Sequence, residues 1–137
     1  MEKSLLICII DDDDISRYSL SRNLTKLSPS REMLVFPDGE EAIGYMENNV
    51  GNSSNLPDII FLDINMPIMD GFQFMEEYDK LNPLFDKKVN IYMMSSSINK
   101  EDIQRAKTVS RISDYLIKPV EMDKLADLLT SMEVDKN

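Results

Sequence analysis

Short apolar runs alternate along the chain with longer segments whose apolar residues recur at helical spacing. A run of four to seven apolar residues is typical of a buried strand, and spacing of three and four residues is typical of an amphipathic helix. Five such alternations predict a parallel sheet with helices on both faces. The expected strands are Ser4–Ile10, Met33–Phe36, Asp58–Leu62, Val89–Met94 and Ile112–Ile117. The expected helices begin near Ile15, Asp38, Asp70, Asn99 and Glu121 and end near Leu27, Val50, Asn82, Thr108 and Met132.

Polar residues at the helix starts support this pattern. Either Asp13 or Asp14 is suited to cap the first helix. Asp70 is followed three residues later by Gln73, which is the spacing of a capping box. The third helix is therefore expected to begin near Asp70.

Four of the apolar runs end in residues suited to phosphate chemistry. The first leads into Asp11 and Asp12, the third into Asp63, the fourth into Ser95, and the fifth into Lys118. In an open α/β sheet the carboxyl ends of the strands form the edge where ligands bind. The sequence therefore predicts that three carboxylates, a hydroxyl and an ammonium group meet there.

Such a cluster of carboxylates needs a compensating charge. Two unit charges about 4 Å apart repel by roughly 4 kcal/mol at an effective dielectric near 20. A bound cation relieves this repulsion, or the pKa of one group rises. Mg²⁺, or Mn²⁺ in its place, is the expected cofactor because it takes one or two carboxylates together with phosphate oxygens.

The same residues are suited to phosphoryl transfer. A carboxylate such as that of Asp63 can attack phosphorus and form an aspartyl phosphate. Charge on the transferred group must then be offset by cations, and Lys118 supplies one as a compact point charge. The Ser95 hydroxyl and the Ser96 backbone N–H are expected to donate hydrogen bonds to the phosphoryl group.

Composition narrows the classes of function. The 137 residues carry a net charge of -10, which argues against binding to nucleic acid or an anionic membrane. No apolar run approaches the roughly 20 residues needed to span a bilayer. The single cysteine, Cys8, lies in the first apolar run and is expected to be a buried hydrophobic residue. We expect a cytoplasmic protein in which residues 1–137 form one domain without an output domain.

The polar positions occur in motifs that resemble the receiver domain of two-component response regulators, here of the stand-alone type. The resemblance covers essentially the whole chain in order and spacing. The matching segments are Ile10–Asp13, Leu62–Gly71, Met94–Ser96 and Tyr115–Pro119.

This resemblance implies a flavodoxin-like (βα)₅ three-layer sandwich with the sheet order 2-1-3-4-5. It implies that Asp63 accepts a phosphoryl group from a histidine kinase or histidine phosphotransfer protein. Asp11, Asp12 and Asp63 would hold the metal together with the backbone carbonyl of Asn65, one of the first two through water. Lys118 would bind the phosphoryl group, and the Lys118–Pro119 peptide bond would be cis.

The resemblance also assigns a conformational switch to Ser95 and Tyr115. A separate effector protein would bind the face formed by the fourth helix, the fifth strand and the fifth helix. Ser95 departs from the threonine that is commoner at its position, and Asp14 makes the first loop unusually acidic. Such a domain is not a classical enzyme, although it would catalyse its own phosphorylation and dephosphorylation at Asp63.

Two other functions are compatible with parts of the pattern. One is a receiver-like protein-binding module that is never phosphorylated. The other is an aspartyl-phosphate phosphatase of the haloacid dehalogenase type. That chemistry needs a general acid two residues after the nucleophile, where this chain has Asn65.

Overall fold

In the computed structural model, five parallel strands form one sheet in the order β2-β1-β3-β4-β5. The structure describes residues 5–28, 32–96 and 99–136. The strands are β1 (Leu6–Ile10), β2 (Glu32–Phe36), β3 (Ile59–Asp63), β4 (Asn90–Ser95) and β5 (Ile112–Ile117). The expected flavodoxin-like fold and strand order are confirmed. The first strand begins at Leu6, and Ser4 lies outside the described residues.

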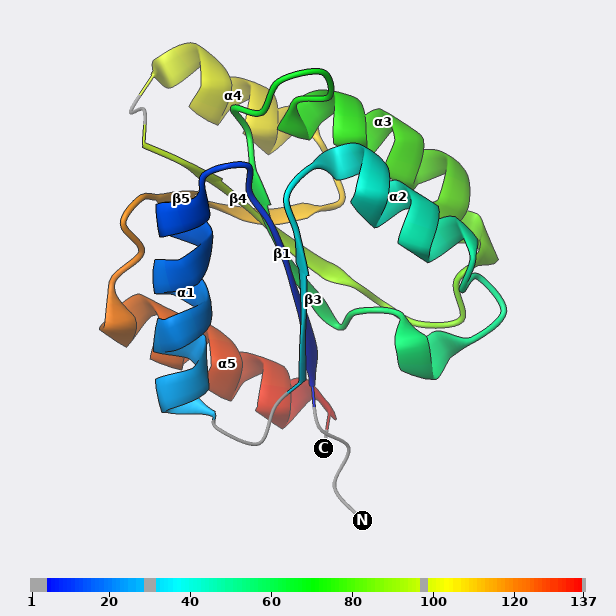
Figure 1. Ribbon diagram of the computed structural model, residues 1–137, viewed down its shortest axis with the longest axis horizontal. Coiled ribbons are helices and arrows are strands. Elements are labelled where there is room, and N and C mark those ends of the chain that lie inside the picture. The colour runs from blue at the N-terminus through cyan, green and yellow to red at the C-terminus, as the bar shows by residue number, and fades with distance from the viewer. Residues whose placement is uncertain (1–4, 29–31, 97–98, 137) are drawn as a thin grey trace.

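Helices cover both faces of the sheet (Figure 1). Helices α1 and α5 lie together on one face, and α2, α3 and α4 lie on the other. Their bounds are α1 (Asp14–Leu27), α2 (Gly39–Glu47), α3 (Gly71–Leu81), α4 (Lys100–Thr108) and α5 (Met122–Lys136). Two short 3₁₀ helices, η1 (Ser53–Asn55) and η2 (Asn82–Leu84), follow α2 and α3.

Alternation along the central strands divides the core into two parts. In β1, Cys8 and Ile10 pack towards α2 and α3, while Ile7 and Ile9 pack towards α1 and α5. Successive side chains of a strand point to opposite faces, so a strand buried on both sides is apolar throughout. Cys8 is fully buried, as expected, and burial raises the pKa of its thiol.

The helix starts follow from side-chain caps. Asp13, rather than Asp14, caps α1 by accepting the backbone N–H groups of Ile15 and Ser16. The capping box of α3 is complete, with Asp70 and Gln73 each accepting the other's backbone N–H. A cap satisfies donors that have no partner within the helix, and so fixes where the helix begins.

A buried ion pair joins the sheet to the loops at the end opposite the carboxyl edge. Lys87 Nζ lies 3.1 Å from Asp58 Oδ1 and donates to the carbonyl oxygens of Ser53 and Leu56. Asp58 Oδ2 accepts the backbone N–H of Leu6 at 2.8 Å. This residue therefore links the start of β1 to the loops before β3 and β4.

We predict that Asp58→Ala lowers the free energy of unfolding by about 3 kcal/mol, because it leaves the Lys87 charge in a mostly buried place without its carboxylate. The matched control is Asp79→Ala, which breaks the half-exposed pair between Asp79 and Arg111. That change should cost less than about 1 kcal/mol. Urea denaturation of both variants measures the difference, and equal losses would contradict the prediction.

The prediction that residues 1–137 form a single domain without an output domain stays a prediction. Within the residues that the structure describes, no helix is long and apolar enough to cross a membrane.

Candidate phosphoacceptor site

The carboxyl edge of the sheet collects the polar residues that end the strands. Parallel pairing sets Ile10 of β1 beside Leu62 of β3, and Asp63 beside Met94 of β4. Ser95 of β4 pairs with Ile117 of β5. Asp63 and Ser95 are the last residues of β3 and β4, so each of these strands extends one residue further than the sequence predicted. The register thus brings residues from four strand ends to one place.

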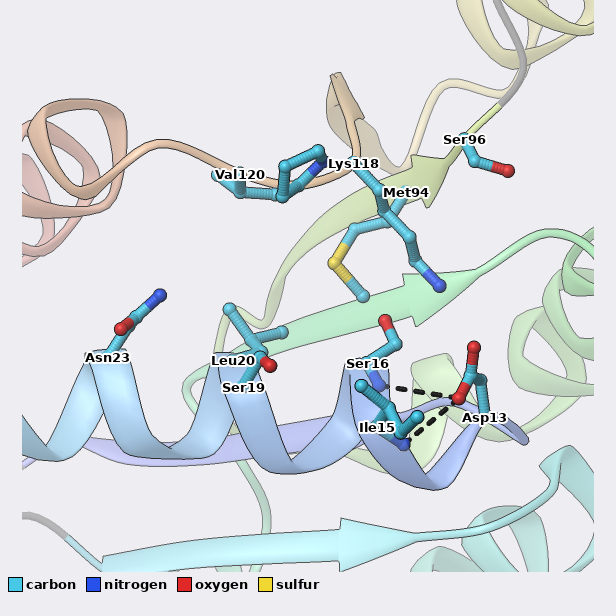
Figure 2. A pocket seen from close by; sticks show the side chains of 11 residues that line it. Asp13, Ile15, Ser16, Ser19, Leu20, Asn23, Met94, Ser96, Lys118 and Val120 are labelled. Atoms are coloured by element: carbon cyan, nitrogen blue, oxygen red, sulfur yellow. Dashed lines mark hydrogen bonds between the residues drawn. The ribbon is translucent and has the colours of Figure 1, made fainter.

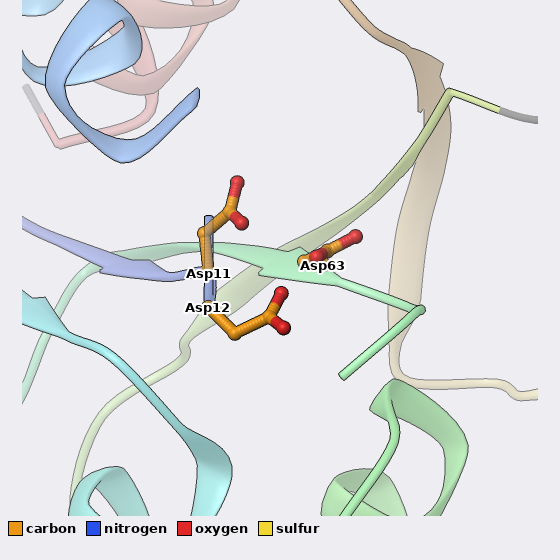
Figure 3. A group of neighbouring side chains, drawn as sticks. All are labelled: Asp11, Asp12 and Asp63. Carbon is orange, nitrogen blue, oxygen red and sulfur yellow. The ribbon is translucent and has the colours of Figure 1, made fainter. Parts of the chain in front are cut away.

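Three carboxylates lie at this edge (Figure 3). Asp11, Asp12 and Asp63 each offer one oxygen, and these oxygens lie within 4.8 Å of one another. Asp11 is 0% exposed and Asp63 is 4% exposed, whereas Asp12 is open to solvent. The cluster is therefore a pocket with two buried acids and one at its mouth.

Lys118 brings the positive charge of the pocket. Its ammonium nitrogen lies 2.7 Å from Asp11 Oδ2 and 3.4 Å from Asp63 Oδ1. The backbone N–H of Lys118 donates to the Ser95 carbonyl at 2.9 Å, which continues the β4–β5 pairing. The Lys118–Pro119 peptide bond is cis, as the resemblance implied.

The balance of charge differs between the two buried acids. Burial, together with the charge of Asp11, raises the pKa of Asp63 to about 7 although Lys118 acts in the opposite direction. Burial also tends to raise the pKa of Asp11, but hydrogen bonds from Lys118, the Asp13 N–H and Ser16 outweigh it and the pKa is lowered. Burial thus dominates at Asp63, whereas at Asp11 the hydrogen bonds together outweigh burial.

These residues fit a hard divalent cation. Carboxylate oxygens within bonding reach of one centre are ligands that Mg²⁺ and Mn²⁺ prefer, and Asp12 at the mouth leaves space for retained water. Burial is the main cause of the raised pKa of Asp63, and a bound cation would instead favour the charged form of this carboxyl. The three acids thus agree with the magnesium site that the sequence motifs implied.

A measurable pH dependence follows from the pKa of Asp63. The folded protein holds this proton up to about pH 7, whereas an unfolded aspartate loses it near pH 3.8. The metal-free protein should therefore lose stability as pH rises from about 4 to about 7, because in this window the folded state binds more protons than the unfolded state.

The melting temperature in EDTA, compared between the wild type and Asp63→Asn, isolates this contribution from that of other groups. From pH 4 to pH 7 the melting temperature of Asp63→Asn should rise relative to that of the wild type. Mg²⁺ at pH 7 should stabilise the wild type more than the variant. Parallel pH profiles of the two proteins would contradict the assignment.

The remaining predicted site residues lie around this pocket. Ser95 is fully buried, and its hydroxyl oxygen accepts a hydrogen bond from Asn65 Nδ2 at 3.1 Å. The backbone N–H of Asn65 donates to Asp63 Oδ1 at 3.3 Å. Ser96 is exposed just after β4, and Tyr115 is half-buried in β5 against the α2–α3–α4 side of the core. Ser95 thus lies close to the acids, while Tyr115 is set back in the sheet.

The loop between β3 and α3 passes tightly over the acids. A Cβ atom on Gly71 would lie 2.9 Å from the Asp63 carbonyl oxygen and from Ile64 Cα, so only glycine fits there. Gly71 therefore relieves crowding where the loop enters α3, which is a structural role. Ile68, which is 86% exposed, has a φ of 72°, a region that β-branched residues rarely adopt.

Two residues that the sequence analysis did not select contact Asp11. Ser16 Oγ donates to Asp11 Oδ2 at 2.7 Å, and Arg17 donates to the Asp11 backbone carbonyl at 2.7 Å. Both come from the first turn of α1, which the Asp13 cap places over the end of β1. In the sequence, these two residues could be noticed only because they are hydrogen-bond donors that follow the acidic run. The geometry of α1 shows that both reach Asp11.

A cleft of about 350 Å³ opens beside Lys118 between α1 and the segment after β5 (Figure 2). Leu20 and Met94 form part of its apolar wall, and Ser96 lies at its rim. Ile15 and Tyr18 of α1 are large apolar residues that are exposed nearby. Lys118, which also contacts Asp11 and Asp63, therefore borders a cleft on the side of α1.

The sheet order and the position of the pocket define a flavodoxin-like α/β domain. Residues 7–130 match the family model described as the response regulator receiver domain. The chain belongs to the response regulator receiver domain family, as the sequence motifs indicated.

Known relatives agree with this membership. The chain is 23% identical over 124 residues to the probable methanogenesis regulatory protein FilR2 of Methanothrix harundinacea, covering 90% of this chain and 78% of that protein. It is 29% identical over 114 residues to the sensor histidine kinase CheAY of Helicobacter pylori, covering 83% of this chain but only 13% of the kinase. The solved structure of a response regulator receiver protein from Dyadobacter fermentans superposes with a TM-score of 0.80 at 26% identity, covering 94% of this chain and 98% of that one.

Proposed function

We propose that this receiver domain accepts a phosphoryl group on Asp63 from a phosphohistidine of a histidine kinase or histidine phosphotransfer protein. The observation that carries the proposal is the meeting of Asp11, Asp12, Asp63 and Lys118 in one pocket. Relatedness to a sensor histidine kinase supports a donor from a two-component system. The phosphoryl group of such donors originates from ATP, so the proposal places the protein in the cytoplasm.

The chemistry is a displacement at phosphorus. An Asp63 carboxylate oxygen forms the new O–P bond while the P–N bond to the histidine ring breaks. The ring nitrogen leaves with the electron pair of that bond and takes a proton from solvent. A group transferred in this way carries negative charge on three equatorial oxygens, and the protein must offset it.

The Lys118 ammonium and a backbone N–H group would offset part of the negative charge on the transferred phosphoryl group. The Lys118 ammonium, already 3.4 Å from Asp63 Oδ1, would bind a phosphoryl oxygen, and the Ser96 N–H would donate to another. The residues suited to hold Mg²⁺ or Mn²⁺ are Asp11, Asp12, Asp63 and the backbone carbonyl of Asn65. When bound, this divalent ion would supply positive charge in addition to that of the Lys118 ammonium.

The response would be a change in the population of two conformations. The Ser95 hydroxyl bonds to Asn65 in the structure, and a phosphoryl group on Asp63 offers it a stronger, charged acceptor. Tyr115 would then move towards the space that Ser95 leaves. Both residues lie near the face of α4, β5 and α5, where we expect a separate effector protein to bind. Ile117 and Met122 are exposed apolar residues on that face.

The test is phosphoryl uptake by the whole chain from a small-molecule donor such as acetyl phosphate. Wild-type protein should incorporate about one phosphoryl group with Mg²⁺ and almost none with EDTA. Beryllofluoride with Mg²⁺ should shift the NMR signals of Ser95 and Tyr115. Tight Mg²⁺ binding without any uptake or beryllofluoride response would favour a protein-binding module that is never phosphorylated, and steady turnover of phosphate esters would favour a phosphatase.

A further inference from the structure

The Asp11 carboxylate is held by donors on both of its oxygens. Oδ1 accepts the backbone N–H of Asp13 at 3.0 Å. Oδ2 accepts two hydrogen bonds, each 2.7 Å long, from the Ser16 hydroxyl and from the Lys118 ammonium. A carboxylate oxygen offers two lone pairs, so within the described part of the chain Oδ2 is matched by two donors and Oδ1 by one.

The start of α1 explains how Ser16 reaches this position. Asp13 accepts the N–H groups of Ile15 and Ser16, so α1 begins within the acidic run, at Asp14. The first turn then lies over Asp11, with Ser16 half-buried. Figure 2 shows the Ser16 hydroxyl and the Lys118 ammonium turned towards each other across the base of the cleft.

We infer that Ser16 is a positioning residue for the metal-binding acid Asp11; this inference rests on the proposed function. Without the hydroxyl, the described donors to this carboxylate are reduced to the Lys118 ammonium on Oδ2 and the Asp13 N–H on Oδ1, so its orientation is less firmly held. With the hydroxyl, the plane of the carboxylate is fixed from the helix side. The carboxylate is then held beside those of Asp12 and Asp63, where one oxygen of each of the three acids lies within 4.8 Å of the others.

A purely structural role of Ser16 predicts something different. Ser16 would then only help to begin α1, and its removal would lower stability without changing ion binding. A group that orients a ligand instead changes metal affinity, typically by about 10- to 100-fold when it is removed.

The experiment measures the Mg²⁺ dissociation constant of the whole chain by isothermal titration calorimetry. We expect Ser16→Ala to weaken Mg²⁺ binding by about 10- to 100-fold. Ser16→Thr keeps the hydroxyl and should stay close to the wild type. The matched control is Ser19→Ala on the same helix, where the side chain is exposed and makes no contact with Asp11.

Phosphoryl uptake gives a second readout. For Ser16→Ala, the Mg²⁺ concentration for half-maximal rate should rise in step with the dissociation constant, while the rate at saturating Mg²⁺ stays near that of the wild type. Circular dichroism of all variants checks that each is folded.

The possible results distinguish a failure of the proposed function from a failure of the role assigned to Ser16. Absence of Mg²⁺ binding by the wild type would overturn the proposed function and the inference with it. Wild-type affinity in Ser16→Ala, with normal Mg²⁺ binding by the wild type, would overturn the inference alone. An equal loss of affinity in Ser19→Ala would also overturn it, because the effect would then belong to the helix and not to the hydroxyl.

Discussion

Replacing Asp63 with asparagine should abolish phosphoryl uptake, reducing the incorporated label to background. The amide has nearly the same shape as the carboxylate but lacks the anionic oxygen that attacks phosphorus. The fold should survive, because asparagine removes one of two negative charges that repel each other in the pocket. Incorporation of phosphorus-32 from acetyl phosphate, followed by mass spectrometry of the intact chain, measures the effect.

The matched control is Asp14→Asn, the same chemical change in the acidic run. Asp14 is exposed and pairs with Arg17 at the surface, outside the group of three acids. This variant should take up the phosphoryl group as the wild type does. Undiminished labelling of Asp63→Asn would show that another residue is the acceptor.

Replacing Lys118 with methionine should slow phosphoryl uptake by about 100- to 1000-fold, the effect typical of removing one preorganised group that stabilises charge in a transition state. Methionine keeps the apolar stem and removes the ammonium. Lys118→Arg should recover only part of the rate, because the planar guanidinium does not reproduce a compact point charge. Single-turnover kinetics at saturating Mg²⁺ measure both variants.

Loss of Lys118 should also change stability. The ammonium lies 2.7 Å from a carboxylate that is fully buried, so its removal leaves Asp11 uncompensated and should cost about 3 kcal/mol without metal. Added Mg²⁺ should restore much of the lost free energy of unfolding. The control is Lys88→Met, a change at an exposed lysine at the opposite end of the sheet, which should alter neither rate nor stability. A normal rate in Lys118→Met would remove Lys118 from the site.

Much of this site could be predicted from the chain itself. A fully buried parallel strand is apolar throughout, so the first charged residue after it marks its end almost without ambiguity. Asp11 follows β1 in this way. Lys118 follows β5, an edge strand that contains Asp114, so there only the apolar run Tyr115–Ile117 marks the end. Asp63 closes β3 and is paired in the sheet, so the strand continues one residue further than hydrophobicity indicates.

Other features depend on contacts between distant segments. Asp58 was expected to begin a strand, but it precedes β3 and binds Lys87 from a loop 29 positions later. The choice between Asp13 and Asp14 as the cap of α1 depends on backbone angles that both residues could adopt. The closeness of the Lys118 ammonium to Asp11 rather than Asp63 reflects the path of the chain after β5.

The sequence alone determined the alternation of strands and helices, the sheet edge that carries the chemistry, and the identities of the acids and the lysine that gather there. These follow from hydrophobic periodicity, which is a local property. Only the tertiary structure decided that the pKa of Asp63 is raised and that the Ser16 hydroxyl donates to Asp11. A pKa depends on burial and on charges from other strands, and the direction of a hydroxyl depends on where its helix lies against the sheet.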